Sequence, residues 1–353
     1  MDKRYFSNKL AKWYEINKRA LPWRETSDPY RIWLSEIILQ QTRVAQGLPY
    51  YERFIERFAN VAQLAAAPEK EVLRLWQGLG YYSRARNLHS CAKEVVNNHK
   101  SRFPETFAAL RQLKGIGDYT AAAIASISFG QPVAVVDGNV YRVLSRIFGL
   151  DDDISSPAGK KAFSKLANEL VDPRQPNIHN QALMEFGALH CTPRNPKCDS
   201  CVFADGCFAR EKGIQHELPV KTKQKSARTR YFYYAVVRKG SSILMGQRSG
   251  KDIWQGLYDF ALIEAPRRLG EANIIAEINQ RFNTRLQLES VTISRSYKHI
   301  LTHQRLFSRF IVIEANGSFA LSKGSLKFYS PKKIAALPKP ALISRFLDDY
   351  NFL

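Results

Sequence analysis

The stretch "LKGIGDYTAAA" (residues 113–123) places a glycine on each side of one isoleucine and then opens an alanine-rich helix. A Gly-x-Gly turn between two helices lets the backbone take positive φ angles and turns several N–H groups toward one point. Together with the dipole of the second helix, these groups suit a phosphate oxygen. Gly115 and Gly117 are therefore candidate contacts to a nucleic-acid backbone, and a tight turn without any ligand is the alternative.

The composition of the 353-residue chain favours a folded protein with a polyanionic partner. Apolar residues make up 45% of the chain and charged residues 24%, which is ordinary for a globular protein. Lys and Arg number 53 against 32 Asp and Glu, a net charge of +21, which favours phosphate binding through counterion release. An anionic membrane surface would explain the charge as well. No apolar run reaches about 18 residues and the first residues lack the apolar core of a signal peptide, so we expect a cytoplasmic protein with no membrane-spanning helix.

The apolar pattern divides the chain into a helical part and a strand-rich part. Residues 1–210 show helical spacing, broken by Gly- and Pro-containing turns. Residues 212–230 carry six basic side chains and one acidic side chain, and we interpret them as a basic linker or a solvated tether. Beyond them, β runs predict a hairpin around Lys239-Gly240, with one helix at about 270–283 and another near the C-terminus.

Four of the five cysteines lie in one short loop, "CTPRNPKCDSCVFADGC". Cys191, Cys198, Cys201 and Cys207 have six, two and five residues between neighbours. Four thiolates in one loop can close a tetrahedral shell around one zinc ion or hold the corners of an iron-sulfur cubane. The spacing alone predicts a metal site and leaves these two alternatives open.

Two carboxyl groups stand in apolar surroundings. Asp137 ends the apolar run of "VAVVDGNVYRV" just before Gly138, where it can cap a helix or face a developing cation. Glu36 is the lone carboxyl of "RIWLSEIILQQT", a segment that is apolar around nearly its full circumference. Most helical glutamates are solvated, but a buried one needs a partner or a function.

The hairpin, Asp137 and the cysteine spacing together resemble the endonuclease III superfamily of helix-hairpin-helix DNA glycosylases. The resemblance implies a DNA-binding hairpin, a catalytic aspartate at Asp137 and one [4Fe-4S] cluster on the four cysteines, with zinc as the fallback. Superfamily members that also cut the strand carry a nucleophilic lysine at the position of Tyr119. A hydroxyl residue there is similar to the MutY-type adenine glycosylases, which implies base removal without strand cleavage.

The MutY-type resemblance extends to "LPWR", "SE", "LQQT", "GLGYYSR" and "NQALMEFGALHC". It implies that Glu36 protonates adenine and activates water, while Asp137 stabilises the oxocarbenium ion. The remaining implied site residues are Arg24 and Gln181 in the adenine pocket, Gln41 and Tyr81 as wedges that fill the gap left by a flipped base, and Asn139 beside the catalytic aspartate. Gln181 has a plainer alternative as a helix-surface residue, and Tyr81 has one as an ordinary loop-packing residue.

Residues from about 231 onward resemble the Nudix-like domain of the same family. A working Nudix hydrolase needs an R-E-x-x-E-E pattern, which "GEANIIAEINQRF" lacks, so we expect no nucleotide hydrolysis. The family recognises 8-oxoguanine through a loop usually written Phe-Ser-His. Here the matching residues are Leu301, Thr302 and His303, so the hydroxyl and the imidazole are kept and the aromatic side chain is replaced.

These observations predict a multidomain protein with an all-α glycosylase core followed by an α+β Nudix-like domain. The expected domains are 1–20 with 131–211, 21–130, the linker 212–230, and 231–353. The expected enzyme is a monomeric, nucleoid-associated, bacterial-type glycosylase acting on double-stranded DNA with adenine opposite 8-oxoguanine or guanine. The alternatives are a bifunctional or pyrimidine-specific glycosylase and a catalytically silent, cluster-containing DNA-binding module.

Overall fold

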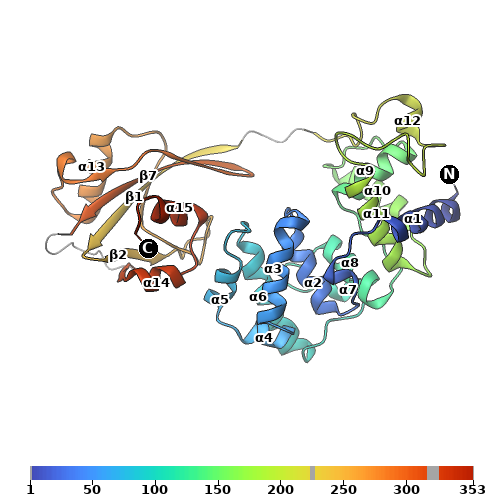
Figure 1. The fold of residues 1–353 in the computed structure, drawn as a ribbon, viewed down its shortest axis with the longest axis horizontal. Coiled ribbons are helices and arrows are strands. Elements are labelled where there is room, and N and C mark those ends of the chain that lie inside the picture. The colour runs from blue at the N-terminus through green and yellow to red at the C-terminus, as the bar shows by residue number, and fades with distance from the viewer. Residues whose placement is uncertain (1, 223–226, 316–325, 353) are drawn as a thin grey trace. The chain divides into compact units, whose positions relative to one another are not determined.

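The computed structural model describes residues 2–222, 227–315 and 326–352. The chain forms two compact units, one of Met1–Ala66 with Asn87–Lys223 and one of Ala67–Arg86 with Gln224–Leu353. The first unit is helical and the second is built on a β-sheet (Figure 1). This confirms the predicted order of a helical core and an α+β domain. Residues 223–226 of the expected linker and 316–325 of the expected last domain lie outside the described residues.

Short helices joined by turns make up most of the helical part of the chain, as the Gly and Pro breaks predict. Their bounds are α1 (Lys3–Asn17), η1 (Pro22–Arg24), α2 (Pro29–Leu39), α3 (Val44–Arg57), α4 (Val61–Ala66), α5 (Glu69–Leu75), α6 (Ser83–His99), α7 (Phe107–Leu110), α8 (Asp118–Phe129), α9 (Gly138–Phe148), α10 (Pro157–Leu170), α11 (Pro176–Leu189) and α12 (Phe208–Lys212).

α2 shows how local sequence places a polar group in the interior. Asp28 caps the helix by accepting a hydrogen bond of 2.9 Å from the Tyr30 N–H, and Pro29 occupies the first turn. Every residue from Ile32 to Ile38 is buried, which confirms the expectation from the apolar circumference. Glu36 therefore enters the interior because its own helix has no solvated face at that point.

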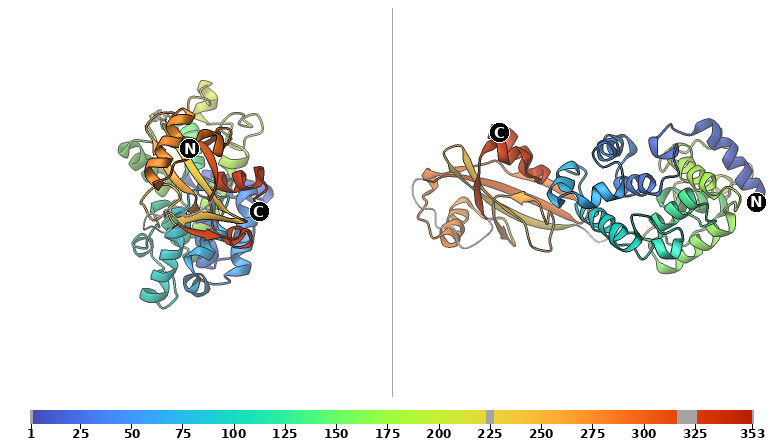
Figure 2. Two further views of the ribbon diagram at one scale, coloured as in Figure 1. Left: turned by 90° about the vertical axis from the view of Figure 1, so that its left-hand side faces the viewer. Right: turned by 90° about the horizontal axis from the view of Figure 1, so that it is seen from below.

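One hydrophobic core joins α1 to α9, α10 and α11. Phe6 of α1, Phe163 of α10 and Phe186 of α11 are fully buried in it, together with Phe203 of the cysteine loop. The Phe6 and Phe203 rings stack with centroids 5.0 Å apart. The start of the chain consequently lies beside helices that come much later in the sequence (Figures 1 and 2).

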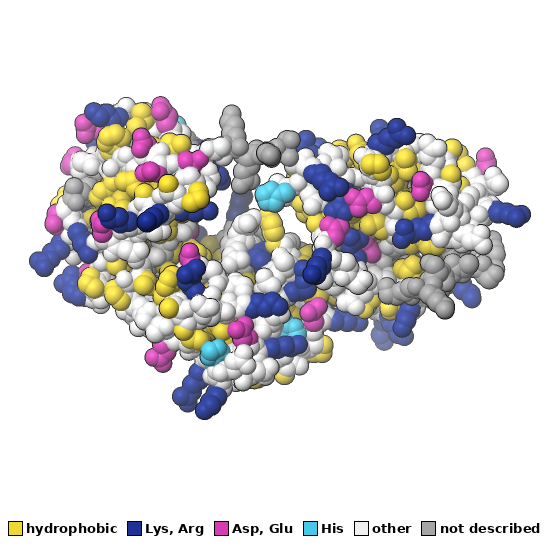
Figure 3. Space-filling model, turned by 180° about the vertical axis from the view of Figure 1, so that it is seen from behind, with side chains coloured by type: hydrophobic (Ala, Val, Ile, Leu, Met, Phe, Trp, Pro, Cys, Tyr) yellow, Lys and Arg dark blue, Asp and Glu magenta, His cyan; other side chains and the backbone are white. Residues whose placement is uncertain are grey.

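Lys and Arg side chains are scattered over the face of the molecule drawn in Figure 3, and Asp and Glu side chains are fewer there. Within the described part of the chain, no helix is long and apolar enough to cross a membrane.

A mixed sheet forms the centre of the second unit. Its central strands, β1 (Arg228–Lys239) and β7 (Gln304–Glu314), run parallel with Arg228 opposite Gln304. The other strands pair antiparallel with their neighbours: β2 (Ser242–Gln247) and β4 (Ala261–Ala265) with β1, β5 (Thr292–Ile293) and β6 (Tyr297–Leu301) with β7, and β3 (Tyr258–Asp259) and β8 (Lys327–Tyr329) with β2. Lys239 lies opposite Ser242, which confirms the predicted hairpin.

Each face of this sheet is covered by a helix, because side chains of successive strand residues point to opposite faces. Tyr233, Ala235 and Val237 of β1 pack with α13 (Glu271–Phe282), which confirms the helix predicted there. On the other face, Phe310 stacks on Phe346 of α15 (Ala341–Asp349), with ring centroids 3.9 Å apart. The sheet thus lies between α13 and α15 (Figure 2), and α14 (Pro331–Ala336) precedes α15.

The segment 291–315 contains three strands where the sequence predicted two. β5 is only Thr292–Ile293, and Ser294 then leaves the regular ladder. The Ser294 hydroxyl accepts the Phe310 N–H at 2.9 Å and donates to the Arg295 carbonyl, so a side chain replaces part of the backbone pairing. Such local side-chain bonds compete with strand pairing and divide the run.

Candidate active site

A pocket of about 430 Å³ in the first unit brings most of the predicted site together. It lies among η1, α2, α8, α9 and α11. Six residues that the sequence placed in one site line it: Arg24, Glu36, Tyr119, Asp137, Asn139 and Gln181. Residues separated by more than a hundred positions in the chain therefore meet in one concave site, as an active site requires.

Glu36 is a buried carboxyl group with one close partner. Its side chain accepts a hydrogen bond of 2.6 Å from the Tyr119 hydroxyl, and the residue is 8% exposed. Burial raises the pKa of Glu36 to about 7, the charge of Asp137 adds to the rise, and the Tyr119 hydrogen bond and the charge of Arg24 oppose it. A carboxyl group with this pKa can both give and take a proton near neutral pH.

Asp137 occupies the N-cap of α9 and also faces the pocket. It accepts hydrogen bonds from the Asn139 and Val140 N–H groups at 2.9 and 2.8 Å, and from the Asn139 amide at 2.8 Å. Burial raises the pKa of Asp137, and these donors and the nearby Arg142 oppose the rise. The N-cap predicted for Asp137 is present, and the bonds that cap the helix also favour the carboxylate anion, so a catalytic role is compatible with the cap and stays a prediction.

Tyr119 lies in the first turn of α8 and contributes a hydroxyl group to the pocket. Burial, followed by the charges of Glu36 and Asp137, raises its pKa well above the ordinary value, so the phenol stays protonated. Among the described residues that line the pocket, none is a lysine. The side chains gathered here therefore supply no lysine amine for a Schiff base.

Arg24 is held at the pocket wall by a residue that the sequence analysis missed. The buried Glu185 of α11 accepts hydrogen bonds from Arg24 at 2.8 and 2.7 Å and from the Arg19 side chain at 2.8 and 2.5 Å. Burial alone would raise the pKa of Glu185, but these two guanidinium groups outweigh it and lower the pKa to about 2. Two arginines therefore share one carboxylate, which leaves a net positive charge beside the pocket.

Gln181, which the sequence predicts in the same pocket as Arg24, is held less firmly. Its side-chain oxygen accepts one hydrogen bond of 3.3 Å from the Tyr14 hydroxyl, and the residue is half-buried. Unlike Arg24, it has one long and weak contact instead of a bidentate ion pair.

Gln41 and Tyr81 do not line this pocket, and they share an uncommon backbone conformation. Both are non-glycine residues with positive φ, 55° for Gln41 and 47° for Tyr81. Both are exposed, Gln41 after the end of α2 in the first unit and Tyr81 in the second unit. Left-handed backbone at a non-glycine residue costs roughly 1 kcal/mol or more and persists where neighbouring structure imposes it. Their role as wedges stays a prediction.

Only one glycine of the hairpin needs its special backbone freedom. Gly115 has φ +79°, and a Cβ there would meet the Asn87 Cβ at 2.8 Å. Gly117 has extended backbone (φ −94°, ψ −178°), so the expectation of positive φ was wrong for it. Gly117 is the N-cap of α8 and brings no side chain to that helix end, which leaves the first-turn N–H groups accessible.

The four cysteines of the loop between α11 and α12 lie close enough to influence one another. Burial raises the pKa of Cys201 to about 11, and the charges of Cys191, Cys207 and Cys198 add to the rise. Nitrogen donors approach three of the sulfurs: Arg146 at 3.4 Å from Cys191, Phe203 N–H at 3.4 Å from Cys201, and Gln215 at 3.9 Å from Cys198. Four cysteine sulfurs in one loop, three of them with an N–H donor nearby, are the kind of donor set that an iron-sulfur cluster takes.

Comparison with protein families divides the chain in the same way. Residues 34–173 match the HhH-GPD superfamily of base excision DNA repair proteins, residues 191–207 match the iron-sulfur binding domain of endonuclease III, and residues 233–349 match the NUDIX domain. An adenine DNA glycosylase of Buchnera aphidicola subsp. Schizaphis graminum is 33% identical over 309 residues, which cover 86% of this chain and 84% of that protein. The chain belongs to the adenine DNA glycosylase family.

Other relatives agree with this membership. The human adenine DNA glycosylase is 44% identical over 222 residues, 60% of this chain, and the match spans 41% of the human protein. Among solved structures, a thermostable thymine-DNA glycosylase is 31% identical, with a TM-score of 0.55 over 60% of this chain and 97% of that chain. A trapped endonuclease III–DNA intermediate, 23% identical with a TM-score of 0.52 over 61% of this chain and 99% of that chain, shares the fold.

The cysteine loop of this adenine DNA glycosylase family member holds one [4Fe-4S] cluster. Cys191, Cys198, Cys201 and Cys207 stay the predicted ligands, and a cluster held by them would close a loop that has no helix or strand of its own. The zinc alternative is thereby replaced.

Two arginines that the sequence analysis missed tie the cysteine loop to α9. Arg142 is buried and donates to the Cys191 carbonyl at 2.8 Å, the Gly187 carbonyl at 2.7 Å and the Asn139 side chain at 2.8 Å. Arg146 donates to the Thr192 carbonyl at 2.7 Å besides its contact to Cys191. Asn139 in turn bonds Asp137, so the first cysteine of the loop and the pocket aspartate belong to one hydrogen-bond network.

A second predicted group of residues meets in the second unit. A pocket of about 510 Å³ is lined by Tyr81, Thr302 and His303, which the sequence assigned to base recognition. Leu301 lines it too, in the place of the family's aromatic residue. Trp254 also lines this pocket; it has φ +63° and meets the His299 ring edge-on at 5.7 Å. The pocket therefore contains aromatic side chains although Leu301 is aliphatic.

Proposed function

We propose that this protein excises adenine paired with 8-oxoguanine or guanine from double-stranded DNA and leaves an abasic site without cutting the strand. The observation that carries the proposal is the buried Glu36, with its pKa of about 7, in one pocket with the hydrogen-bonded Asp137. Cleavage of an N-glycosidic bond needs a proton for the leaving base and a negative charge beside the cationic sugar, and these two carboxyl groups supply both.

The reaction follows from the two groups in turn. Protonated Glu36 gives its proton to a ring nitrogen of adenine, and the bond between the sugar C1′ and N9 breaks with its electron pair passing to the base. The Asp137 carboxylate stabilises the resulting oxocarbenium ion. Water then adds to C1′, and the Glu36 carboxylate takes the proton that this water loses, which restores the acid.

Arg24 and Gln181 are proposed to orient the adenine in the pocket. Arg24 presents a guanidinium whose direction is fixed by Glu185, and Gln181 presents an amide that can both donate and accept. An adenine in a duplex cannot reach the pocket, so the nucleotide must leave the stack, and Gln41 and Tyr81 are proposed to fill the gap. Their exposure supports this role.

The base opposite the adenine is proposed to bind in the pocket of the second unit. Thr302 and His303 offer a hydroxyl and an imidazole to an oxidised purine edge, and Trp254 offers an aromatic face. The hairpin at Gly115 and Gly117 and the net charge of +21 are proposed to bind the DNA backbone.

The test is single-turnover excision by the cluster-loaded protein from duplexes with adenine opposite 8-oxoguanine, guanine, cytosine or thymine. Fast excision opposite 8-oxoguanine, slower excision opposite guanine and little opposite the pyrimidines is the expected order. Equal rates on all four pairs would contradict base-pair selectivity. In a further duplex with a thymine–guanine pair, thymine excision would favour the pyrimidine-specific alternative instead, and an abundant covalent adduct trapped by borohydride would favour the bifunctional one.

A further inference from the structure

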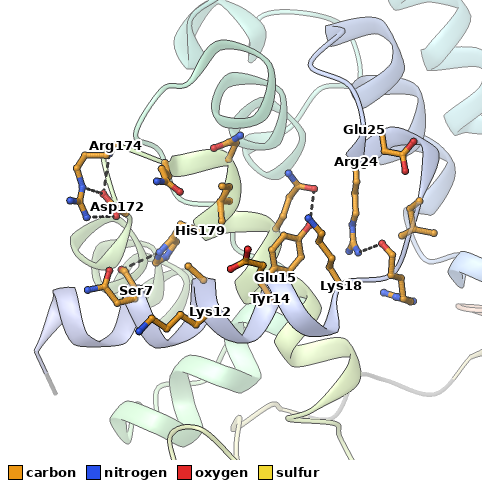
Figure 4. Close-up of a pocket in the computed structure, with 18 of the residues that line it drawn as sticks. Ser7, Lys12, Tyr14, Glu15, Lys18, Arg24, Glu25, Asp172, Arg174 and His179 are labelled. Carbon is orange, nitrogen blue, oxygen red and sulfur yellow. Dashed lines mark hydrogen bonds and ion pairs between the residues drawn. The ribbon is translucent and has the colours of Figure 1, made fainter.

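A second cavity of about 890 Å³ lies in the first unit between α1 and the start of α11 (Figure 4). Side chains spaced three or four residues apart on α1 line one side, among them Ser7, Ala11 and Tyr14, and residues 172–181 line the other. The cavity is about twice the size of the 430 Å³ active-site pocket. The chemistry of base excision gives it no role.

The two cavities share part of their lining. Arg19, Leu21, Arg24 and Gln181 line both of them and so form their common wall. Since Gln181 and Arg24 are the residues proposed to contact adenine, this wall lies on the base side of the active-site pocket.

One part of the wall is fixed and one part can move. Arg19 and Arg24 are both bound to the buried Glu185 by short, charge-assisted hydrogen bonds. Among the described residues, the Gln181 side chain has a single hydrogen bond, accepted from the Tyr14 hydroxyl at 3.3 Å, which is long for an O–H donor. A rotamer change of Gln181 would therefore cost one weak hydrogen bond, whereas moving either arginine would separate an ion pair.

The polar groups of the second cavity suit a neutral heterocycle better than an anion. Its arginines are already paired, Arg174 with Asp172 at 2.9 Å (Figure 4) and Arg19 and Arg24 with Glu185. Their positive charge is therefore partly neutralised, and a free phosphate or carboxylate would have to compete with these carboxylates. Lys12 and Lys18 also line the cavity, but so do Glu15 and Glu25, so the lining carries both signs of charge.

His179 adds a buried acceptor. The Ser7 hydroxyl donates to the Leu170 carbonyl at 3.1 Å, so it accepts from His179 Nδ1 at 3.3 Å, and Nε2 then carries the lone pair. Burial lowers the pKa of His179 to about 4, which keeps the ring neutral. Within the described part of the chain Nε2 has no hydrogen-bond partner, but this atom is closed to solvent although His179 lines the cavity, so a ligand would reach it only after a shift of the lining. A purine, which carries both N–H donors and ring-nitrogen acceptors, can also pair with the amide and hydroxyl groups of the lining, among them Asn8, Tyr14 and Gln181.

We propose that the second cavity is the exit route of the excised adenine. A flipped nucleotide points its base toward the Gln181 wall and its sugar toward the mouth, where the DNA covers the pocket. After C1′–N9 cleavage, Gln181 swings aside, the free purine passes into the second cavity, and it leaves to solvent while the abasic strand is still bound. The inference rests on the proposed adenine excision and adds the order of product release to it.

The test follows both products in one sample. An excess of cluster-loaded enzyme is bound to an immobilised duplex that carries radiolabelled adenine opposite 8-oxoguanine. Three quantities are then measured over time: alkali-labile abasic sites, free adenine in the wash, and enzyme retained on the DNA. For the wild type, free adenine should appear at the rate of abasic-site formation, with the enzyme still on the DNA.

Two variants place an indole side chain in the second cavity, at positions that belong to neither the proposed catalytic nor the adenine-binding residues. Asn8→Trp and Ala11→Trp should form abasic sites at the wild-type rate but release adenine at least about tenfold more slowly, which corresponds to about 1.4 kcal/mol. Ile16→Trp is the matched control, because Ile16 lies on the same helix, is 84% exposed and does not line the cavity. It should behave as the wild type.

Two results would overturn the exit route. One is adenine release at the wild-type rate from both Asn8→Trp and Ala11→Trp, and the other is a wild-type enzyme that releases adenine only when it leaves the DNA. Absence of abasic sites with the wild type would instead contradict adenine excision itself, so the two failures are distinguishable.

Equilibrium dialysis of free adenine against the DNA-free, cluster-loaded protein tests the cavity without turnover. Asn8→Trp and Ala11→Trp should each bind one equivalent of adenine fewer than the wild type and Ile16→Trp. Equal binding by all four proteins would contradict adenine binding in the second cavity.

Discussion

Glu36 on α2 and Asp137 at the start of α9 face the same pocket, but the two sides of that pocket hold their carboxyl groups differently. Glu36 lies in an apolar helix and accepts a hydrogen bond from one neutral phenol. Asp137 accepts three hydrogen bonds and lies near the Arg142 guanidinium. Burial raises the pKa of both, but several donors favour the anion only at Asp137. The α2 side is thus suited to exchange a proton, and the α9 side to keep a charge.

The largest effect on excision should come from removing the proton donor on α2. Glu36→Gln keeps the size of the side chain and removes the exchangeable proton, so single-turnover adenine excision should fall by roughly a thousandfold or more. Binding to the mismatched duplex, measured by fluorescence anisotropy, should be kept. Glu52→Gln, at an exposed position on α3, is the control. Excision by Glu36→Gln at the wild-type rate would remove Glu36 from the mechanism.

Breaking the α9 side should have the next largest effect. Asp137→Asn keeps a good N-cap residue for α9 and removes the charge, so excision should fall about a hundredfold to a thousandfold while the thermal unfolding midpoint changes little. The contrast with Asp137→Ala separates the two roles, because alanine removes the cap as well and should also lower the midpoint. If the asparagine variant excises adenine normally, Asp137 serves only as a cap.

The Arg142→Met variant tests whether Asp137 and Asn139 depend on the cysteine loop to hold them in place. Arg142→Met leaves the Cys191 and Gly187 carbonyls without this donor and frees Asn139, so excision should fall about tenfold, an effect typical of residues that orient reactive groups. The pH at which the rate is half-maximal should stay where Glu36 sets it. A shift of that pH in Arg142→Met would show that the two sides are not independent. The visible absorption of the cluster checks that the loop is still loaded.

The smallest effect on the excision rate should come from Tyr119→Phe. Its main effect should be on the pH dependence of excision, which Glu36 sets. Protonated Glu36 is the acid, so the excision rate should fall as the pH rises through the Glu36 pKa of about 7. The Tyr119 hydrogen bond favours the anion and lowers that pKa; without it the pKa rises, and the fall should move to higher pH. A fall at the same or at lower pH in Tyr119→Phe would contradict the assigned hydrogen bond.

The sequence predicted those features of the site that depend on local pattern. The cap at Asp28 and the apolar circumference of α2 are enough to place Glu36 inside, and the position of Asp137 before Gly138 is enough to place it at a helix start. The sheet pairing around Lys239-Gly240 was also accessible, because a hairpin turn is local.

The features that the sequence did not reveal depend on contacts between distant segments. Glu185 lies 161 residues from Arg24 and has the ordinary pattern of a helix residue, so nothing near it signals two arginine partners. Nothing in the sequence around Arg142 and Arg146 signals that both are buried and bonded to the cysteine loop. Gly115 and Gly117 look equivalent in "KGIG", but only Gly115 has a positive φ and lies against the Asn87 side chain.

The stacking of Phe6 on Phe203 has a consequence for how the chain is made. A ribosome completes α1 first, but the surface that buries Phe6 and Leu10 exists only once α9, α10, α11 and the cysteine loop have been synthesised. Contacts of such high sequence separation form late and carry a large loop-closure entropy. The opening helix must therefore stay exposed through most of synthesis, and its alternation of Lys and Arg with aromatic residues keeps it charged enough to remain solvated during that interval.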